Sequence, residues 1–309
     1  MPELPVTTPP TARLIYAALE AKQRRDLHPR LSASKLDDCE RAQWDAFRWA
    51  FPPEEFDGQK LSIFETGEVW EQRLGQRLLD AGVDFRPVDP ATGEQFRVVF
   101  AGGHASGRTD GEALDLPEAP KTMHVVEFKS HNDKSFKDLL RKKVREAKPL
   151  HHAQMQVYMG QRGHARALYV AVNKNDDAVY VERVEFDPLE YARLMTRAER
   201  IVSADRRPAC GCAPYLIKAG YGCAKTEGAM PSRSCRTCLH VSAHLDGDAR
   251  WSCARWGRDL TEDEQRAGCE RHLFNPDLIP GEQVDADEGG EWVRYELRTG
   301  ETWADGGRG

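Results

Sequence analysis

The sequence predicts an α/β protein in which a central mixed β-sheet is flanked by helices and followed by a small cysteine-rich C-terminal module. Helical spacing of apolar residues dominates up to residue 82, strand and helix patterns alternate up to residue 205, and seven of the eight cysteines follow residue 209. Alternating strands and helices are typical of a sheet covered by helices. These observations divide the chain into an N-terminal arm and helix (1–30), a core (31–205), a cysteine-rich metal-binding module (206–280) and a C-terminal hairpin and tail (281–309).

The composition bounds the class of protein. The 309 residues are 40% hydrophobic with a mean hydropathy of −0.66, which describes a soluble globular chain. No run of 18 apolar residues and no charged-then-apolar leader occurs, so we expect neither a membrane span nor a secretory signal. We therefore expect a cytoplasmic protein without a membrane partner, and in a reducing compartment a cysteine cluster favours metal binding over disulfides.

Three helices are expected before the first long strand. The first covers about 11–23, after a proline-rich start. The second lies within 32–50, where Ser34 is a candidate N-cap for a run of apolar residues at helical spacing. The third covers 61–82 and ends at a glycine, Gly82, which suits a helix C-terminus.

The pattern then changes to strands. Residues 94–114, "EQFRVVFAGGHASGRTDGEAL", predict a hairpin around the "AGGH" turn, and residues 122–130 predict the next strand. The remaining elements expected are helices over 133–147 and 149–162, two strands within 166–186, a helix from Pro188 to about 204, and a short hairpin with a frayed end over 291–307.

Charged side chains are expected to gather where these strands end. Glu127 and Lys129 point to the same face because side chains alternate along a strand. Asp110 follows a predicted strand and precedes Gly111, where a sharp turn can leave its carboxylate at the sheet edge. An ion pair and an ordinary turn are the simpler interpretations of these two features.

Two helices supply further candidates. Gln154 and Tyr158 are four residues apart on a predicted helix and share one face, and Glu71 lies in the middle of an earlier helix. Helix packing and a surface acid are the ordinary interpretations. Two carboxylates on neighbouring strands can instead hold Mg²⁺, which activates water for phosphodiester hydrolysis, while a lysine steers that water and stabilises the developing anion.

The segments "GRTDG", "EFK" and "QMQVY" occur in this order and resemble the motifs of the PD-(D/E)XK nuclease superfamily, in its RecB-like and lambda-exonuclease-like branch. The resemblance covers about residues 30–205, and "FETGEVWEQRL" and "CRTCLHV" are similar to phage-type members. It implies a restriction-endonuclease-like core with Mg²⁺ or Mn²⁺ on Glu71, Asp110 and Glu127, a catalytic Lys129, and Gln154 and Tyr158 on the motif helix. Asp110 lacks the preceding proline of the motif, as is usual in this branch.

Residues 136–152 form a basic segment. A solvated helix face is the ordinary interpretation, but next to an acidic metal site the segment would be a track for DNA phosphates. The basic residues in question are Lys137, Arg141, Lys142, Lys143, Arg145 and Lys148. The net charge of −6 does not favour nucleic acid as a partner, although charge acts locally.

The cysteines fall into two sets. Cys235, Cys238, Cys253 and Cys269 have the spacing C-x2-C-x14-C-x15-C, which is typical of a zinc or iron–sulfur site, with four unrelated buried thiols as the alternative. The other set is Cys39, Cys210, Cys212 and Cys223. One cysteine before the core and three after it resembles the [4Fe–4S] layout of RecB-like iron–sulfur nucleases, although the C-x-C spacing departs from it. These four could also lie idle, or Cys39 could join the first set.

The function expected is that of a Mg²⁺- or Mn²⁺-dependent DNA nuclease, an exonuclease of recombination or DNA-end processing in a phage or bacterium. DNA and a recombination or replication protein would be its partners. The alternative is a non-catalytic nucleic-acid-binding or recruitment protein that keeps the nuclease fold. The complete set of Asp110, Glu127 and Lys129 favours the enzyme, since a binding protein would be free to lose one of them.

Overall fold

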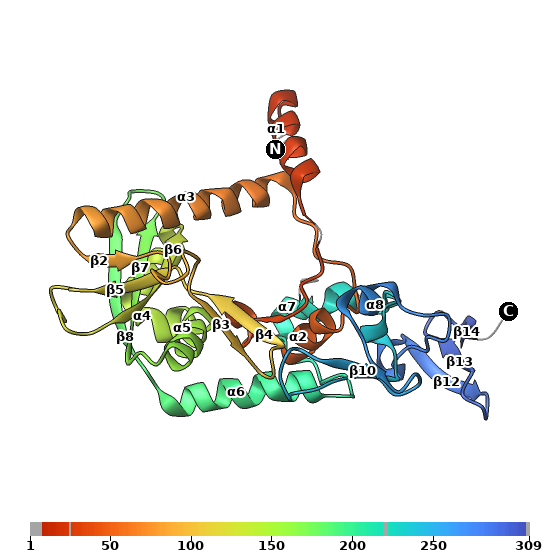
Figure 1. The fold of residues 1–309 in the computed structure, drawn as a ribbon. Helices are drawn as coiled ribbons and strands as arrows, with labels where there is room; N and C mark the ends of the chain where they lie inside the picture. Colours follow the sequence, from red (N-terminus) through yellow and green to blue (C-terminus); the bar gives the residue numbers. More distant parts are fainter. Residues whose placement is uncertain (1–7, 25, 219–221, 307–309) are drawn as a thin grey trace.

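The computed structural model describes residues 8–24, 26–218 and 222–306 (Figure 1). Its helices are α1 (Pro10–Lys22), α2 (Glu40–Phe47), α3 (Gly58–Asp80), α4 (Asp133–Ala147), α5 (Pro149–Arg162), α6 (Pro188–Ser203), α7 (Pro214–Lys218) and α8 (Glu262–Ala267), with 3-10 turns η1 (Ala33–Lys35), η2 (Gly222–Thr226), η3 (Cys235–Thr237) and η4 (Pro276–Leu278). Its strands are β1 (Leu31–Ser32), β2 (Asp84–Arg86), β3 (Arg97–Phe100), β4 (Ala105–Arg108), β5 (Gly111–Leu114), β6 (His124–His131), β7 (Arg166–Asn173), β8 (Val179–Glu185), β9 (Val241–Ala243), β10 (Trp251–Cys253), β11 (Arg258–Asp259), β12 (Gly281–Ala286), β13 (Trp292–Leu297) and β14 (Thr302–Gly306).

A five-stranded mixed sheet forms the centre of the first part of the chain. The strand order is β2-β5-β6-β7-β8, and only the β6–β7 pair is parallel. A parallel pair needs a crossover connection, and α4 and α5 supply it between β6 and β7. The predicted fold class, a mixed sheet flanked by helices, is confirmed.

The two faces of this sheet are covered by different helices. Val126 and Phe128 of β6 pack with Trp70 and Leu74 of α3, whereas Val125 belongs to the buried cluster that includes α5. Figure 1 shows α3 along one side of the sheet and α4 and α5 along the other. The alternation of side chains along β6 therefore sends neighbouring residues into two separate layers.

The predicted hairpin around "AGGH" exists, but it lies outside the central sheet. β3 and β4 pair antiparallel and join β1 in a separate three-stranded sheet. The sequence did not indicate β2 or β5, because they are short and β5 contains Gly, Glu and Ala, which rarely signal a strand. Gly111 has φ +151°, and a Cβ there would lie 2.5 Å from the Phe85 ring, so only glycine lets β2 approach β5 this closely.

The helix predicted within 32–50 is divided. Residues 33–35 form η1, and α2 begins only after Cys39, so the prediction of Ser34 as its N-cap is wrong. α3 starts three residues earlier than expected because the Asp57 side chain accepts a hydrogen bond from the Lys60 N–H at 2.8 Å. Gly82 follows this helix with φ +81°, as expected of a glycine at a helix end.

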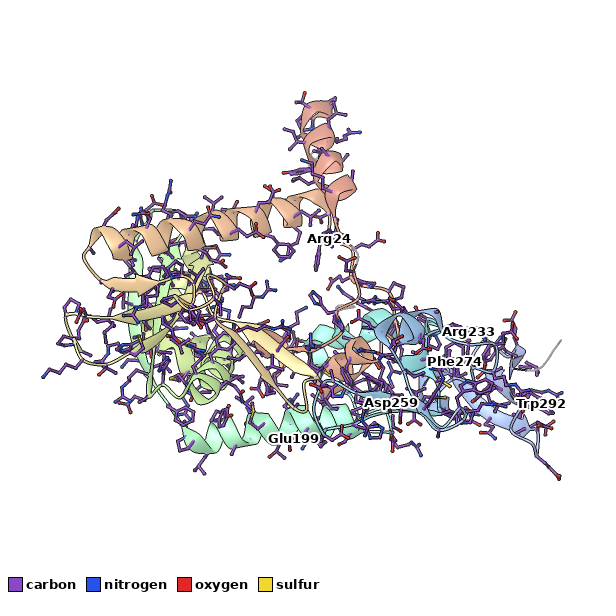
Figure 2. All side chains as sticks on the ribbon, viewed as in Figure 1. Arg24, Glu199, Arg233, Asp259, Phe274 and Trp292 are labelled. Atoms are coloured by element: carbon purple, nitrogen blue, oxygen red, sulfur yellow. The ribbon has the colours of Figure 1, made fainter. Side chains whose placement is uncertain are left out.

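The C-terminal part is built on small antiparallel sheets. β9, β10 and β11 form one, and β12, β13 and β14 form another, so the expected tail hairpin gains a third strand. Phe274, labelled in Figure 2, packs with Tyr295 and Trp303 against this last sheet. Within the described residues, no helix is long and apolar enough to cross a membrane.

Arg236 joins the C-terminal part to the start of the core. Its side chain is 2% exposed and donates hydrogen bonds to the carbonyl oxygens of Pro29 and Phe47, both at 2.9 Å. Its guanidinium carbon lies 3.7 Å from the Trp49 ring centre, a cation–π contact. Trp251 belongs to the same buried cluster as the core residues of α2 and α5, so the buried cluster continues across the predicted boundary near residue 206.

Two glycines in helices predict opposite effects on stability. A Cβ on Gly160 of α5 would overlap the Tyr191 ring of α6, whereas a Cβ on Gly67 of α3 would meet nothing within 4 Å. We expect Gly160→Ala to lower the free energy of unfolding by about 1–3 kcal/mol through overpacking, and Gly67→Ala to raise it by about 0.5–1 kcal/mol through helix propensity. Urea unfolding of both variants measures the difference. Equal effects of the two substitutions would contradict the close α5–α6 contact.

Candidate functional site

An acid and a base lie side by side at the end of β6. The Glu127 carboxylate, with a side chain 0% exposed, contacts the ammonium of Lys129, whose side chain is 26% exposed. β5 brings in Asp110, because Gly111 pairs with Val126 in the antiparallel register. The Asp110 Oδ2 atom accepts a hydrogen bond from the Phe128 N–H at 2.7 Å. The strand pairing thus places all three predicted residues at one edge of the sheet.

Helix α5 holds the second oxygen of Glu127. Gln154 Nε2 donates to Glu127 Oε2 at 3.2 Å and to the Tyr158 hydroxyl at 3.1 Å. A Cβ on Gly107 of β4 would lie 2.6 Å from the Tyr158 ring, so this glycine gives the tyrosine its room. Gln154 and Tyr158, the predicted pair on α5, are therefore connected by hydrogen bonds to Glu127 of β6.

Glu71 reaches the same charges from α3. Loss of hydration, and then the neighbouring Asp110 charge, raise the pKa of Glu71 to about 7, while Lys129 opposes the shift. The Glu71 charge also raises the pKa of Glu127, so the Glu71 carboxylate lies within electrostatic range of both Asp110 and Glu127. The structure thus brings together acids from α3, from the residue before β5 and from β6.

The acids of the site hold protons more strongly than usual. Burial raises the pKa of Glu127 to about 8, and the Asp110 charge adds to the shift against the effect of Lys129. Burial likewise raises the pKa of Asp110. The pKa of Lys129 also rises: burial works against this, but the charges of Glu127 and Asp110 outweigh it. Lys129 therefore stays an ammonium, and the acids repel one another in the absence of a further cation.

The donor set suits a hard divalent cation. Glu71, Asp110 and Glu127 offer carboxylate oxygens, the ligands that Mg²⁺ and Mn²⁺ prefer, and their elevated pKa values show that negative charge in this place lacks compensation. The residues present therefore fit such an ion. In the described part of the chain, however, only a group of four cysteines has its ligand atoms all within 4.8 Å of one another. The three acids are spread more widely than those sulfurs.

A pH dependence follows from Glu71 and Glu127. Their folded pKa values, about 7 and about 8, lie above the ordinary value of 4.5, so between these values the folded protein binds more protons than the unfolded chain. Their stabilising effect is complete below about pH 4.5 and is lost as the pH rises through 7 and 8. Between pH 5 and pH 8, the unfolding free energy of the chelator-treated wild type should fall by on the order of 3 kcal/mol more than that of Glu127→Gln, which cannot titrate at this position. Denaturant titrations at both pH values measure this, with the exposed Glu118→Gln as control; parallel curves for Glu127→Gln and wild type would contradict it.

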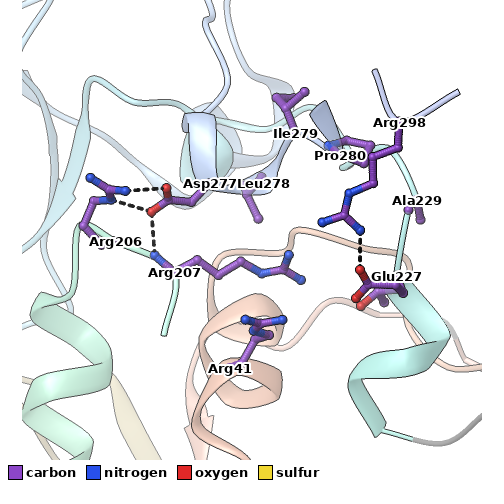
Figure 3. A pocket seen from close by; sticks show the side chains of 12 residues that line it. Arg41, Arg206, Arg207, Glu227, Ala229, Asp277, Leu278, Ile279, Pro280 and Arg298 are labelled. Carbon is purple, nitrogen blue, oxygen red and sulfur yellow. Dashed lines mark hydrogen bonds and ion pairs between the residues drawn. The ribbon is translucent and has the colours of Figure 1, made fainter. Parts of the chain in front are cut away.

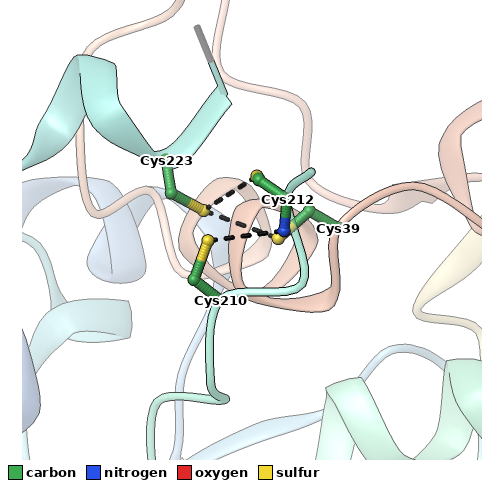
Figure 4. Close-up of side chains that lie close together, drawn as sticks. All are labelled: Cys39, Cys210, Cys212 and Cys223. Atoms are coloured by element: carbon green, nitrogen blue, oxygen red, sulfur yellow. Dashed lines mark hydrogen bonds between the residues drawn. The ribbon is translucent and has the colours of Figure 1, made fainter. Parts of the chain in front are cut away.

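Cys39 and three cysteines of the segment after α6 form a compact cluster (Figure 4). The Sγ atom of Cys223 lies 3.5 Å from that of Cys39 and 3.6 Å from that of Cys212, and Cys210 completes a group whose sulfurs all lie within 4.8 Å of one another. Burial opposes ionisation, but hydrogen bonds from the backbone N–H groups of Ala42 and Gly211 lower the pKa of Cys39 to about 7. Four convergent sulfurs, one of them readily ionised, fit a structural metal centre.

The other four cysteines are arranged differently. Burial, and then the charges of Cys269, Cys238 and Cys253, raise the pKa of Cys235 to about 11, so the four lie within electrostatic range of one another. Their sulfurs do not form a group within 4.8 Å in the described structure, and the Cys235 thiol donates to the Glu264 carbonyl at 3.3 Å. The four cysteines with the C-x2-C spacing are thus less tightly clustered in the structure than Cys39, Cys210, Cys212 and Cys223.

The predicted basic track lies on α4 and is largely paired with acids. Ion pairs join Lys137 to Asp133 at 2.8 Å, Arg141 to Asp138 at 2.8 Å, Lys142 to Asp138 at 3.3 Å and Arg145 to Asp187 at 3.6 Å. Lys143 has φ 61°, which interrupts the helix, and no ion pair is present for it among the described residues. The segment carries less free positive charge than the sequence suggests.

A separate cavity of about 370 Å³ lies in the C-terminal part, beside α2 (Figure 3). Three of the arginines that line it are paired with acids: Arg206 with Asp277 at 2.7 Å, Arg207 with Asp45 at 2.5 Å, and Arg298 with Glu227. The Arg206–Asp277 pair joins the segment after α6 to η4, and the Arg298–Glu227 pair joins the end of β13 to the segment after η2. None of the predicted nuclease residues lines this cavity.

The sequence analysis missed a polar network next to the site. It consists of Ser135, His131, Tyr169, His151 and the ammonium of Lys148. One signal was available, because His151 lies three residues before Gln154 and seven before Tyr158, which places all three on one helix face. The other members depend on the β6–β7 pairing, which no local pattern shows.

Comparisons with known proteins find similar solved structures but no similar sequence family. No family model matches the sequence, and no curated protein does. Among solved structures, the chain is similar to an alkaline exonuclease, LHK-Exo from Laribacter hongkongensis, at 14% identity and a TM-score of 0.37, over 61% of this chain and 89% of that one. The complex of LHK-Exo with dAMP gives the same identity and coverage with a TM-score of 0.40. SSO0001 gives 15% identity and a TM-score of 0.36, over 67% of this chain and 91% of that one.

Proposed function

We propose that the protein is a Mg²⁺- or Mn²⁺-dependent DNA nuclease of the PD-(D/E)XK type, and that it acts as an exonuclease. The observation that carries the proposal is the contact of the fully buried Glu127 with Lys129 at the end of β6, beside the carboxylate of Asp110. Burying charged groups is costly, and a hydrophobic pair of similar size would serve stability at least as well. Strongly shifted pKa values in such a cluster favour a functional role.

Glu71, Asp110 and Glu127 would hold the metal ion in this proposal. When bound, the ion supplies Lewis-acid polarisation of the phosphate and an activated water. The chain fixes its own groups in advance: the Phe128 N–H holds Asp110, and Gln154 holds one oxygen of Glu127 while Lys129 contacts the other. Such preorganisation lowers the reorganisation needed during the reaction.

Lys129 would stabilise the negative charge that develops on the phosphate and orient the attacking water. Its raised pKa keeps it charged at neutral pH, so it serves as an electrostatic group and does not remove the water proton itself. The Tyr158 hydroxyl accepts from Gln154 and thereby fixes the amide against Glu127. Each predicted catalytic residue thus has a defined partner.

DNA would reach this site over the α4 side of the sheet. Lys143, for which the described residues supply no ion pair, would contribute positive charge there, and Lys137, Arg141, Lys142 and Arg145 would add to it if phosphates displaced their acidic partners. The cluster of Cys39, Cys210, Cys212 and Cys223 would hold a structural zinc ion or [4Fe–4S] cluster, and Cys235, Cys238, Cys253 and Cys269 a second metal. A recombination or replication protein remains the proposed partner.

Digestion of end-labelled linear DNA tests the function. The protein, purified anaerobically, is incubated with Mg²⁺, Mn²⁺ or EDTA, and the products are separated over time. Release of labelled mononucleotides with either cation but not with EDTA is expected, while covalently closed circular DNA stays intact. Cleavage of the circle would identify an endonuclease instead, and DNA binding without cleavage would favour the non-catalytic alternative.

A further inference from the structure

A continuous chain of hydrogen bonds runs from an ammonium group to helix α5. The Lys148 ammonium donates to Ser135 Oγ at 2.7 Å, and Ser135 Oγ lies 3.1 Å from His131 Nδ1. His131 Nε2 lies 2.9 Å from the Tyr169 hydroxyl, which lies 2.9 Å from His151 Nδ1. Tyr169 is fully buried and His131 is 7% exposed, so water does not replace these contacts.

The ammonium sets the direction of the donors in this chain. Lys148 has only hydrogens to offer, so Ser135 accepts from it and its own hydroxyl hydrogen is free to go to His131 Nδ1. In that case the proton of His131 is on Nε2, and it goes to the Tyr169 oxygen. Tyr169 then donates its hydrogen to His151 Nδ1. In this direction the Ser135 hydroxyl hydrogen is bonded, and the ring hydrogen left without a partner among the described residues is the one on His151 Nε2, whereas the reverse direction leaves the Ser135 hydroxyl hydrogen without one.

Both rings are neutral, as this direction requires. Burial, and then the charge of Lys148, lower the pKa of His131 to about 4, and burial and the Lys129 charge lower that of His151 to about 3. A neutral His151 that accepts at Nδ1 carries its proton on Nε2. The described protein offers no hydrogen-bond partner for that N–H.

Two observations place His151 next to the candidate active site. His151 shares the face of α5 with Gln154, which is hydrogen-bonded to Glu127. The influence of Lys129 on the ring places it within electrostatic range of the proposed catalytic lysine. The residue is only partly buried, so a ligand of the site can reach it.

We propose that His151 is a substrate-binding residue that donates its Nε2–H to a phosphate oxygen of the polynucleotide, and that Lys148, Ser135, His131 and Tyr169 are positioning residues that fix its tautomer. The inference rests on the proposed nuclease function for the identity of the ligand. The tautomer itself is a property of the chain. In the reverse direction the Nε2 lone pair would be free, and His151 would be a metal ligand or a base instead of an anion donor.

Nitrogen NMR of the ¹⁵N-histidine-labelled protein decides the direction without any nuclease activity. We expect His131 and His151 both to be neutral with the proton on Nε2. Ser135→Ala removes the donor to His131 and should release both rings toward the other tautomer. A proton on Nδ1 of His151 in the wild type would overturn the inference, as would tautomers that Ser135→Ala leaves unchanged.

Ligand binding is measured on the same resonances. In the metal-free protein, a short single-stranded oligonucleotide should shift the Nε2–H signal of His151 at a concentration at which inorganic phosphate does not. Equal shifts from both would assign the donor to free phosphate and overturn the polynucleotide as its ligand. No shift from either would overturn the donor role.

Kinetics of the variants separate the donor from a packing role. His151→Leu removes the N–H and should lower kcat/KM about 10- to 100-fold. His151→Gln, whose amide can place an N–H near the same point, should keep most of the wild-type kcat/KM. Tyr169→Phe should lower kcat/KM less than His151→Leu does. The exposed His28→Leu serves as control. Full activity of His151→Leu in an active wild-type background would overturn the inference, whereas an inactive wild type would contradict the proposed function and leave the NMR result to stand alone.

Discussion

Replacing Lys129 with methionine is expected to slow DNA hydrolysis by roughly 10²–10³-fold while the protein stays folded. The ammonium contacts the buried Glu127, and its removal would take away the stabilisation that we propose it gives to the negative charge developing on the phosphate. The fold should survive because Glu127, with a pKa already near 8, takes up a proton when its partner is lost. Single-turnover hydrolysis of labelled DNA with saturating Mg²⁺ or Mn²⁺ measures the rate, and circular dichroism checks the fold.

The exposed Lys121, in the turn before the same strand, offers a matched control. Lys121→Met removes the same charge and adds the same side chain, and it should leave the rate within about twofold, as surface substitutions usually do. Asp110→Asn should slow DNA hydrolysis to a similar extent as Lys129→Met. If Lys129→Met and Lys121→Met hydrolysed DNA equally fast, the assignment of the site would be wrong.

Replacing Cys39 with serine should remove one metal site and lower the midpoint of thermal unfolding by roughly 10 °C. Cys39 precedes α2, whereas Cys210, Cys212 and Cys223 follow α6, so the bound metal would hold two distant parts of the chain together. Where the structure describes it, the segment that supplies the last three cysteines has few buried apolar side chains of its own. Its folding free energy would therefore come largely from metal binding.

Metal analysis and thermal scans of anaerobically prepared protein measure this effect. Cys269→Ser tests the other four cysteines separately: if each substitution removes its own metal equivalent and the double variant removes both, the sites are independent. Cys39→Ser protein that kept its full metal content and its unfolding midpoint would show that the cluster has no structural metal. Visible absorbance of the wild type then distinguishes iron–sulfur from zinc.

Local patterns were sufficient for much of the core. The alternation in β6 predicted a strand with Glu127 and Lys129 on one face, and Pro149 predicted the start of α5. Short strands were missed because β2 has only three residues and is set by its pairing with β5. The same pairing explains why the predicted hairpin belongs to another sheet.

The cysteines show where local spacing misleads. C-x2-C spacing favoured Cys235 and Cys238, because two close cysteines can share an ion without help from the rest of the chain. The contact of Cys39 with Cys223 joins residues 184 positions apart, and only the packing of α2 against the segment after α6 produces it. Likewise, the Tyr169 contacts with two histidines depend on the parallel register of β6 and β7.

The burial of Arg236 has a consequence for biosynthesis. Its partners Pro29, Phe47 and Trp49 are synthesised about two hundred residues before the arginine. Their carbonyl groups and aromatic faces therefore lack this contact until the arginine has been made. Contacts of such long sequence separation slow folding and extend the lifetime of partly ordered nascent chains. The packing around Pro29, Phe47 and Trp49 is therefore complete only after residue 236 has been made, and chains that stop before it leave this surface open to chaperones and proteases.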